Sequence, residues 1–219
     1  AITDPGTPLE DLARRFGFRR VFSGRPDVGG RFSALTVFGL VPAAVCGFDA
    51  GAALAASEPV IRACRSTAPE KNPAAILGTI LGLLARAGTN KAVFPVSPRN
   101  AGFVDWLEQL IAESTGKEGT GIVPVPERDI AGPGNPGRDR VYIVDAADEA
   151  GFRRRAEERL KKAGLPVVSV HSGDGRSLPG RFYLWEMAVA VACHHLGVNP
   201  FDQPDVEATK RKTREALAS

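Results

Sequence analysis

The sequence contains few of the residues that build disulfide frameworks and metal centres. Only 3 cysteines and 3 histidines occur among its 219 residues. Cys46, Cys64 and Cys193 are widely spaced and form no Cys-x-x-Cys pair, which argues against a disulfide framework or structural zinc site and favours a reducing, cytoplasmic compartment. His194 and His195 follow Cys193 directly, but neighbouring helix residues point in different directions and no third ligand follows at i+3 or i+4. We therefore expect helix packing at this run, and no metal ion.

Charge of one sign and long apolar runs are also scarce. The 28 basic and 25 acidic residues leave a net charge of +3, which is too balanced to predict nucleic-acid binding. Lys/Arg clusters within 153–162 and 210–215 lie beside glutamates, so we interpret them as solvated helix faces. The apolar stretch 74–87 is shorter than the ~18 residues of a membrane span and contains Thr79 and Arg86. No nucleic-acid or membrane partner is expected, and no signal peptide is recognised.

Methionine is nearly absent. Met187 is the only one, and the chain starts at Ala1 without an initiator. The length suits one domain, and the composition, 43% hydrophobic and 24% charged, is that of an ordinary globular protein. The missing initiator raises the question whether these residues are a whole protein or a piece of one.

Short apolar runs alternate with helical patterns along the chain. Helices are predicted from Pro8 for a short stretch and over 33–47, 49–67, 72–87, 100–114, 149–163, 184–196 and 205–218, and strands over 19–22, 91–96, 121–125, 141–144 and 166–170. This alternation predicts an α/β fold with a mainly parallel sheet. Sheets of this kind bind ligands beyond the carboxyl ends of their strands.

Two glycine-containing motifs match familiar patterns and fail on context. The run 132–137 has the letters GxGxxG, but it contains two prolines and precedes a strand, whereas a dinucleotide-binding turn follows a strand and opens a helix. Thr115-Gly116-Lys117 is like the end of a phosphate-binding loop, yet Ile111 occupies the position of the first glycine and Glu118 follows the lysine. Neither nucleotide site is predicted.

Three other segments have spacings suited to chemistry. Gly29 and Gly30 precede Arg31 where a loop meets a helix, so backbone can approach an anion closely there; the alternative is a tight turn with a surface arginine. Gln109 and Glu113 are four residues apart and share one helix face.

The third segment is the C-terminal stretch 197–210. Gln203 and Lys210 are seven residues apart, which is two turns along one helix face. The alternative is a solvated face on which Glu207 pairs with Lys210.

Together these segments resemble the glucose-6-phosphate isomerase family. GGRFS, ESTGK and NPFDQPDVEATK are close matches to its signature regions in the family's order, and 180–186 is similar to the helix before the last motif. The sequence of these segments, including WLEQLIAESTGKEG, is most similar to the bacterial form in which the isomerase is fused behind a transaldolase. The resemblance implies a three-layer sugar-isomerase (SIS-type, flavodoxin-like) α/β domain, with a mainly parallel sheet flanked by helices.

The resemblance also implies roles for six residues. Glu113 would be the catalytic base and Arg31 would stabilise the enediolate. Gly30, Gln109 and Gln203 would bind the sugar phosphate, and Lys210 would contact it near the ring oxygen as a third catalytic residue. The chemistry suits these types, because one carboxylate can move a proton between neighbouring carbons and arginine keeps its charge. No cofactor is implied.

Two departures from the family pattern stand out. The family opens the sugar ring with a histidine, but the matching loop 132–140 has none and His171 is a poor match, so ring opening is expected to fall to Lys210 or another group. The family's Ser/Thr-rich phosphate loop, which lies in an earlier domain, is not found. We therefore expect 1–35 to be the tail of a preceding SIS domain with its connecting loop, 36–200 the C-terminal SIS domain, and 201–219 a C-terminal helix.

The function implied is the interconversion of glucose 6-phosphate and fructose 6-phosphate, in glycolysis and gluconeogenesis. The expected partners are the sugar phosphate, the missing N-terminal SIS domain of the same chain, and a second copy in a homodimer. The fragment alone is expected to be inactive or nearly so. The alternatives are a non-catalytic sugar-phosphate-binding SIS domain and the isomerase half of a bifunctional transaldolase and isomerase.

Overall fold

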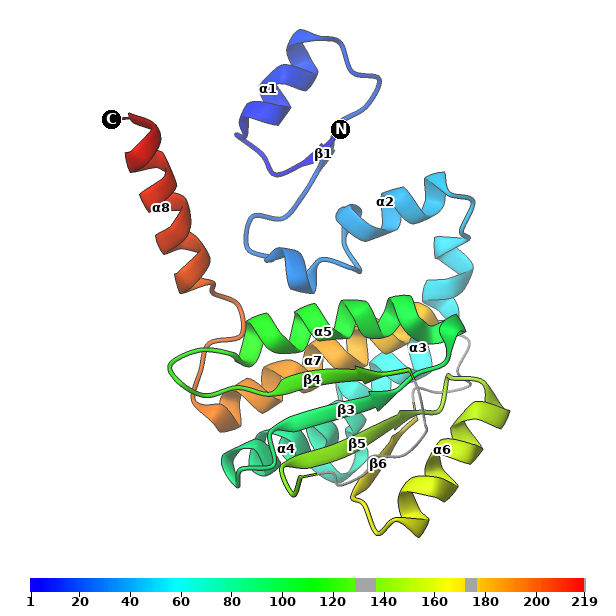
Figure 1. Ribbon diagram of the computed structural model, residues 1–219. Coiled ribbons are helices and arrows are strands. Elements are labelled where there is room, and N and C mark those ends of the chain that lie inside the picture. Colours follow the sequence, from blue (N-terminus) through cyan, green and yellow to red (C-terminus); the bar gives the residue numbers. More distant parts are fainter. Residues whose placement is uncertain (129–136, 172–176, 219) are drawn as a thin grey trace.

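The computed structural model describes residues 1–128, 137–171 and 177–218 (Figure 1). Four strands form the central sheet in the order β4-β3-β5-β6, and all neighbours are parallel. They are β3 (Lys91–Pro95), β4 (Val123–Glu127), β5 (Arg140–Asp145) and β6 (Val167–Val170). Val93 of β3 is in register with Val125 on one side and Tyr142 on the other. The expected α/β fold with a parallel sheet is confirmed.

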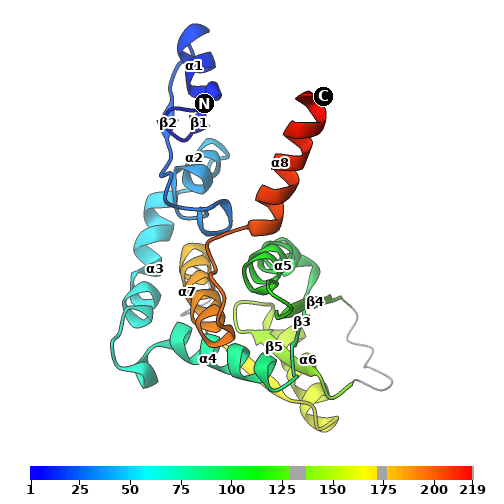
Figure 2. The same cartoon turned by 90° about the vertical axis from the view of Figure 1, so that its left-hand side faces the viewer.

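Helices cover both faces of this sheet, which makes three layers (Figures 1 and 2). The helices are α1 (Pro8–Arg15), α2 (Val37–Val45), α3 (Ala50–Cys64), α4 (Pro73–Arg86), α5 (Ala101–Thr115), α6 (Ala150–Lys162), α7 (Leu178–Leu196) and α8 (Pro204–Ala218). Ala92 and Phe94 face the large core beneath α4, α5 and α7, while Val93 faces the small core beneath α6. This alternation follows from the two-residue period of a strand.

Helix starts follow local capping chemistry. The Thr7 side chain accepts a hydrogen bond from the Glu10 amide, and Asn72 does the same for the Ala75 amide at 2.9 Å, as the sequence predicts for α1 and α4. The expected start of α7 at residue 184 is wrong. Ser177 caps the Gly180 amide at 3.2 Å, so the helix begins at Leu178.

The predicted helix over 33–47 is also shorter than expected. Residues Gly30–Phe32 form a 3-10 turn, η1, and α2 begins only at Val37, capped by Thr36. Two more 3-10 turns are η2 (Pro69–Lys71) and η3 (Pro98–Asn100). The strand expected over 19–22 is the two-residue β2 (Phe22–Ser23).

The two ends of the chain stand away from the central sheet. β1 (Ile2–Thr3) pairs in parallel with β2 across α1 and makes a separate small unit. In both views α8 extends from the body as an arm (Figures 1 and 2). Within the described ranges, no helix is long and apolar enough to cross a membrane.

Candidate active site

Five of the six predicted site residues line one cavity. The cavity has a volume of about 320 Å³ and lies over the outward face of α5, beside η1 and the loop that leads into α8. Its lining residues are Gly30, Arg31, Trp106, Gln109, Leu110, Glu113 and Gln203. The sixth predicted residue, Lys210, belongs to α8, and its side chain lies outside the part of the chain that the structure describes. The structure therefore brings together three segments that are distant in sequence.

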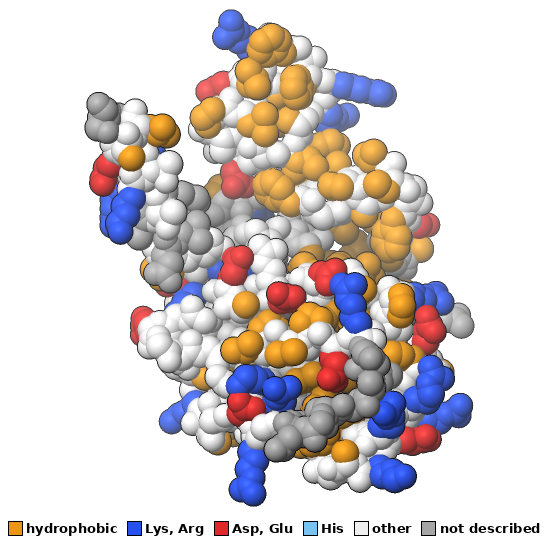
Figure 3. Space-filling model, viewed as in Figure 1, with side chains coloured by type: hydrophobic (Ala, Val, Ile, Leu, Met, Phe, Trp, Pro, Cys, Tyr) orange, Lys and Arg blue, Asp and Glu red, His pale blue; other side chains and the backbone are white. Residues whose placement is uncertain are grey.

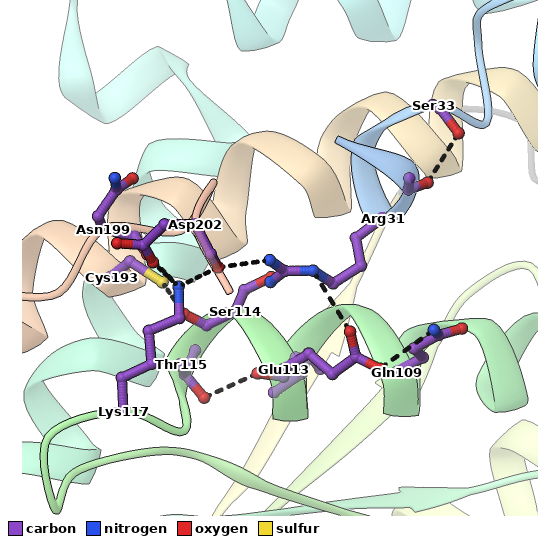
Figure 4. A network of polar contacts seen from close by, with 12 residues as sticks. Arg31, Ser33, Gln109, Glu113, Ser114, Thr115, Lys117, Cys193, Asn199 and Asp202 are labelled. Atoms are coloured by element: carbon purple, nitrogen blue, oxygen red, sulfur yellow. Dashed lines mark hydrogen bonds and ion pairs between the residues drawn. The ribbon is translucent and has the colours of Figure 1, made fainter. Parts of the chain in front are cut away.

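Arg31 is the buried charge of this cavity. Only 6% of the residue is exposed, so the alternative of a tight turn with a surface arginine is wrong. Its Nη1 donates a hydrogen bond to Ser114 Oγ at 2.5 Å and its Nη2 donates to the Asp202 carbonyl at 2.9 Å (Figure 4). Both acceptors are uncharged. Among the described residues, no carboxylate accepts a hydrogen bond from the Arg31 guanidinium.

Glu113 provides the carboxylate that faces this cation. Its Oε2 lies 3.6 Å from Arg31 Nε, and its Oε1 accepts a hydrogen bond from Gln109 Nε2 at 3.1 Å (Figure 4). The Glu113 side chain is 42% exposed, so a ligand can approach it. Arg31 Nε is buried and has no hydrogen-bond partner within the described residues. The cavity thus holds an accessible carboxylate beside a cation with an unused donor.

Burial and the nearby carboxylate act in opposite directions on Arg31. Removal from water lowers the pKa of the guanidinium, and the negative charges of Glu113 and Asp202 oppose that change. Arginine starts from so high a pKa that it stays protonated at neutral pH. The site therefore presents a permanent positive charge.

Trp106 and Leu110 form the apolar wall of the cavity. The indole of Trp106 packs edge-on against Phe182 of α7, with ring centroids 4.6 Å apart. Trp106, Leu110 and Glu113 follow each other along one side of α5, so the helix period that pairs Gln109 with Glu113 could have pointed to the wall too. The sequence analysis did not predict Trp106 and Leu110 as residues of the site.

Lys117, Ser114 and Asp202 are further polar residues of the site that the sequence reasoning missed. Lys117 follows the end of α5, and its buried ammonium contacts the loop that carries Gln203. Asp202 supplies a carbonyl to Arg31, and Ser114 supplies the hydroxyl. Only their position in the sequence could have indicated them, because all three lie within the motifs ESTGK and NPFDQ.

A larger cavity of about 1140 Å³ lies at the carboxyl ends of β3 and β5, where the fold class predicts a ligand. The five gathered residues are not there. Its buried arginine is Arg181, whose Nη2 donates to Asn100 Oδ1 at 2.8 Å and Asp145 Oδ2 at 2.6 Å. Trp106 borders both cavities. The candidate residues thus lie along α5 and not at the strand ends.

The remaining candidates lie elsewhere. His171 borders an apolar hollow between α4 and β6 and does not line the α5 cavity. Most of the loop 132–140, from 132 to 136, lies outside the described residues. Over the described ranges, no group of three or more His, Cys, Asp or Glu side chains could hold a metal ion.

Comparisons with known proteins find similar sequences and similar structures. No family model matches the chain. A glucose-6-phosphate isomerase from Synechococcus sp. (strain JA-3-3Ab) is 30% identical over 257 residues, covering 99% of this chain and 48% of the relative. One from Heliobacterium modesticaldum is 29% identical, covering 93% of this chain and 54% of the relative. The chain spans about half the length of the curated relatives it matches.

Solved structures share the fold. A hypothetical protein from Thermus thermophilus has a TM-score of 0.82 and 25% identity over all of this chain and 62% of that one. A glucose-6-phosphate isomerase from Chlamydia trachomatis has a TM-score of 0.73 and 19% identity, over all of this chain and 52% of that one. The chain is thus a distant homologue of glucose-6-phosphate isomerases and corresponds to about half of their length.

Proposed function

We propose that this chain is part of an aldose–ketose isomerase that interconverts glucose 6-phosphate and fructose 6-phosphate, with Glu113 as the base. The single observation that carries the proposal is the pairing in the α5 cavity: the accessible Glu113 carboxylate lies 3.6 Å from a buried arginine whose hydrogen bonds go to uncharged oxygens. A site that only binds a sugar phosphate has no need for an accessible carboxylate beside its cation.

In this proposal, the Glu113 carboxylate and the Arg31 guanidinium have different roles in the isomerisation. Glu113 removes the proton beside the substrate carbonyl and returns it to the neighbouring carbon, so one carboxylate serves both directions. The enediolate formed in between is negative, and Arg31 stabilises it with a charge that is already fixed in place. Gln109 orients Glu113 through its 3.1 Å hydrogen bond.

The other cavity residues contact the sugar phosphate in this proposal. The backbone of Gly30 and the side chain of Gln203 face the same cavity as Glu113. Lys210 follows Gln203 by seven residues, in α8, and its proposed role near the ring oxygen and in ring opening is the one that the resemblance implies.

We further propose that the chain works with the remaining half of the isomerase and as a homodimer. Its exposed apolar side chains support this: Phe16 and Val45 are 65% and 83% exposed, and orange side chains gather over α1 and α2 in Figure 3.

The pair β1 and β2 is too small to be stable alone. In this proposal residues 1–35 end a preceding SIS domain. The coding sequence upstream of Ala1 tests this, and it also tests the transaldolase fusion, which rests on motif wording alone.

The decisive variant is Glu113→Gln, made in the protein that joins this chain to its other half. We expect turnover of glucose 6-phosphate to fall by about 10²- to 10⁴-fold, because the amide cannot accept the proton. The matched control is Glu108→Gln, the same change on an exposed residue of α5 that does not line the cavity. Equal activity of the two variants would show that Glu113 is not the base. If the wild type binds the sugar phosphate without converting it, the non-catalytic alternative is correct.

A further inference from the structure

We propose that Lys117 is a positioning residue that acts through the backbone of Asp202 on both Arg31 and Gln203. The inference rests on the proposed isomerase function. It concerns how the site is held together, and nothing in the motifs assigns this lysine a role.

Lys117 is buried, and all three of its ammonium protons are used. Its side chain is 6% exposed, and Nζ donates to the Asn199 carbonyl, to the Asp202 carbonyl at 2.8 Å and to Asp202 Oδ1 at 2.6 Å (Figure 4). A lysine that only needed solvation would extend into water, because burying an ammonium is costly unless its donors are satisfied. The Lys117 ammonium therefore donates all of its hydrogen bonds to the loop 199–202.

One carbonyl oxygen links this lysine to the catalytic arginine. The Asp202 carbonyl accepts from Lys117 Nζ and also from Arg31 Nη2 at 2.9 Å. The two cations thus approach the same oxygen from different segments of the chain. A shift of this carbonyl would remove one of the two hydrogen bonds that orient the Arg31 guanidinium.

The same loop leads directly to the cavity and to α8. Gln203 follows Asp202 and lines the cavity, and α8 begins at Pro204. The loop also has an apolar anchor, because the Phe201 ring packs against Phe32 with centroids 4.9 Å apart. Loss of Lys117 should therefore displace the carbonyl by a small amount, while Phe201 keeps the loop on the body.

The test compares Lys117→Met, Lys117→Arg and Lys91→Met in the isomerase that contains this chain. We expect Lys117→Met to lower kcat by about 10- to 100-fold with little change in KM, because the misplaced groups act on the transition state. Lys117→Arg should recover part of the loss. Lys91 is a matched control, since it pairs with Asp139 at the start of β3 and lines none of the cavity; Lys91→Met should keep wild-type kinetics.

Asp202→Asn sharpens the same test. It replaces the carboxylate and leaves the shared carbonyl, so its effect on kcat should be smaller than that of Lys117→Met. Hydrogen exchange of the backbone amides of Asn199 and of 201–203 in the 219-residue chain gives a readout that needs no turnover, and it should be faster in Lys117→Met than in Lys91→Met.

The outcomes separate the two proposals. If the wild type is active, Glu113→Gln is inactive, and Lys117→Met matches Lys91→Met in both kcat and hydrogen exchange, the role of Lys117 is wrong and the proposed function stands. A wild type that binds but does not convert the sugar phosphate overturns the proposed function. In that case, faster exchange confined to Lys117→Met would still support the link to the loop.

Discussion

Arg31 and Arg181 are equally buried, at 6% and 7% exposure, but their surroundings differ. Arg181 donates directly to the Asp145 carboxylate at 2.6 Å, and its guanidinium lies 3.6 Å from the centroid of the Phe103 ring. Arg31 donates to a hydroxyl and a carbonyl, and its carboxylate partner Glu113 is 3.6 Å away. Arg181 is hydrogen-bonded to a carboxylate that is 13% exposed, whereas Arg31 faces a carboxylate that is 42% exposed.

This contrast teaches that size does not identify the site. The cavity beside Arg181 is more than three times the volume of the one beside Arg31. Its arginine nevertheless ties α7 to η3 and β5, because Nη2 donates to Asn100 and to the Asp145 carboxylate. In the proposed function, the cation of the smaller cavity stabilises the developing negative charge.

The largest effect is expected when Arg181 is removed. Arg181→Met leaves Asp145, whose side chain is 13% exposed, without its cation, and we expect the free energy of unfolding to fall by about 3–5 kcal/mol. Urea unfolding monitored by circular dichroism measures this. Arg154→Met, on the exposed face of α6, is the control and should change stability by less than about 0.5 kcal/mol. Stability unchanged in Arg181→Met would break the comparison.

The next effect concerns Arg31 and should appear in activity. Arg31→Lys keeps a charge but loses the fork that bonds Ser114 and Asp202 together. We expect kcat to fall by about 10²- to 10³-fold, the usual cost of removing a preorganised donor. Initial rates across a substrate series measure it. If the variant is instead fully active but strongly destabilised, Arg31 has the same structural role as Arg181.

A pH-dependent effect is expected at Glu186, a half-buried acid of α7. Its Oε1 has no hydrogen-bond partner within the described residues, and burial raises the pKa of the carboxyl to about 8 from its ordinary value of 4.5. The folded chain therefore keeps this proton at pH values where the unfolded chain has lost it. The stability that depends on Glu186 is present below pH 4.5 and is lost as the pH rises toward 8.

The variant Glu186→Gln removes this dependence. Its stability relative to the wild type should rise with pH across that range. Denaturant unfolding at several pH values measures the difference, with Glu158→Gln on the exposed face of α6 as the control. Parallel pH profiles for wild type and Glu186→Gln would contradict the raised pKa.

Local patterns predicted most of the fold. Thr7 and Asn72 predicted two helix starts, and the apolar runs predicted the strands β3, β5 and β6, with β5 buried. The start of α7 was missed because Pro179 and Gly180 look like a loop, whereas the Ser177 cap makes them the first turn of the helix.

The sequence predicted five residues that line the candidate site, but it did not predict their geometry. The period of α5 placed Gln109 beside Glu113, and the motifs supplied Arg31 and Gln203. The contacts of Arg31 reach 83 and 171 positions along the chain, so no local pattern could indicate its burial. The role of Lys117 depends in the same way on a loop 82 to 85 positions away.

The central claim is that Glu113 moves a substrate proton beside Arg31. The most direct measurement is deuterium incorporation at the carbon next to the carbonyl of glucose 6-phosphate and fructose 6-phosphate, followed by NMR in D₂O for the isomerase that contains this chain. We expect incorporation with wild type and Glu108→Gln, and a rate at least about 100-fold lower with Glu113→Gln. Incorporation at the wild-type rate by Glu113→Gln would contradict the account.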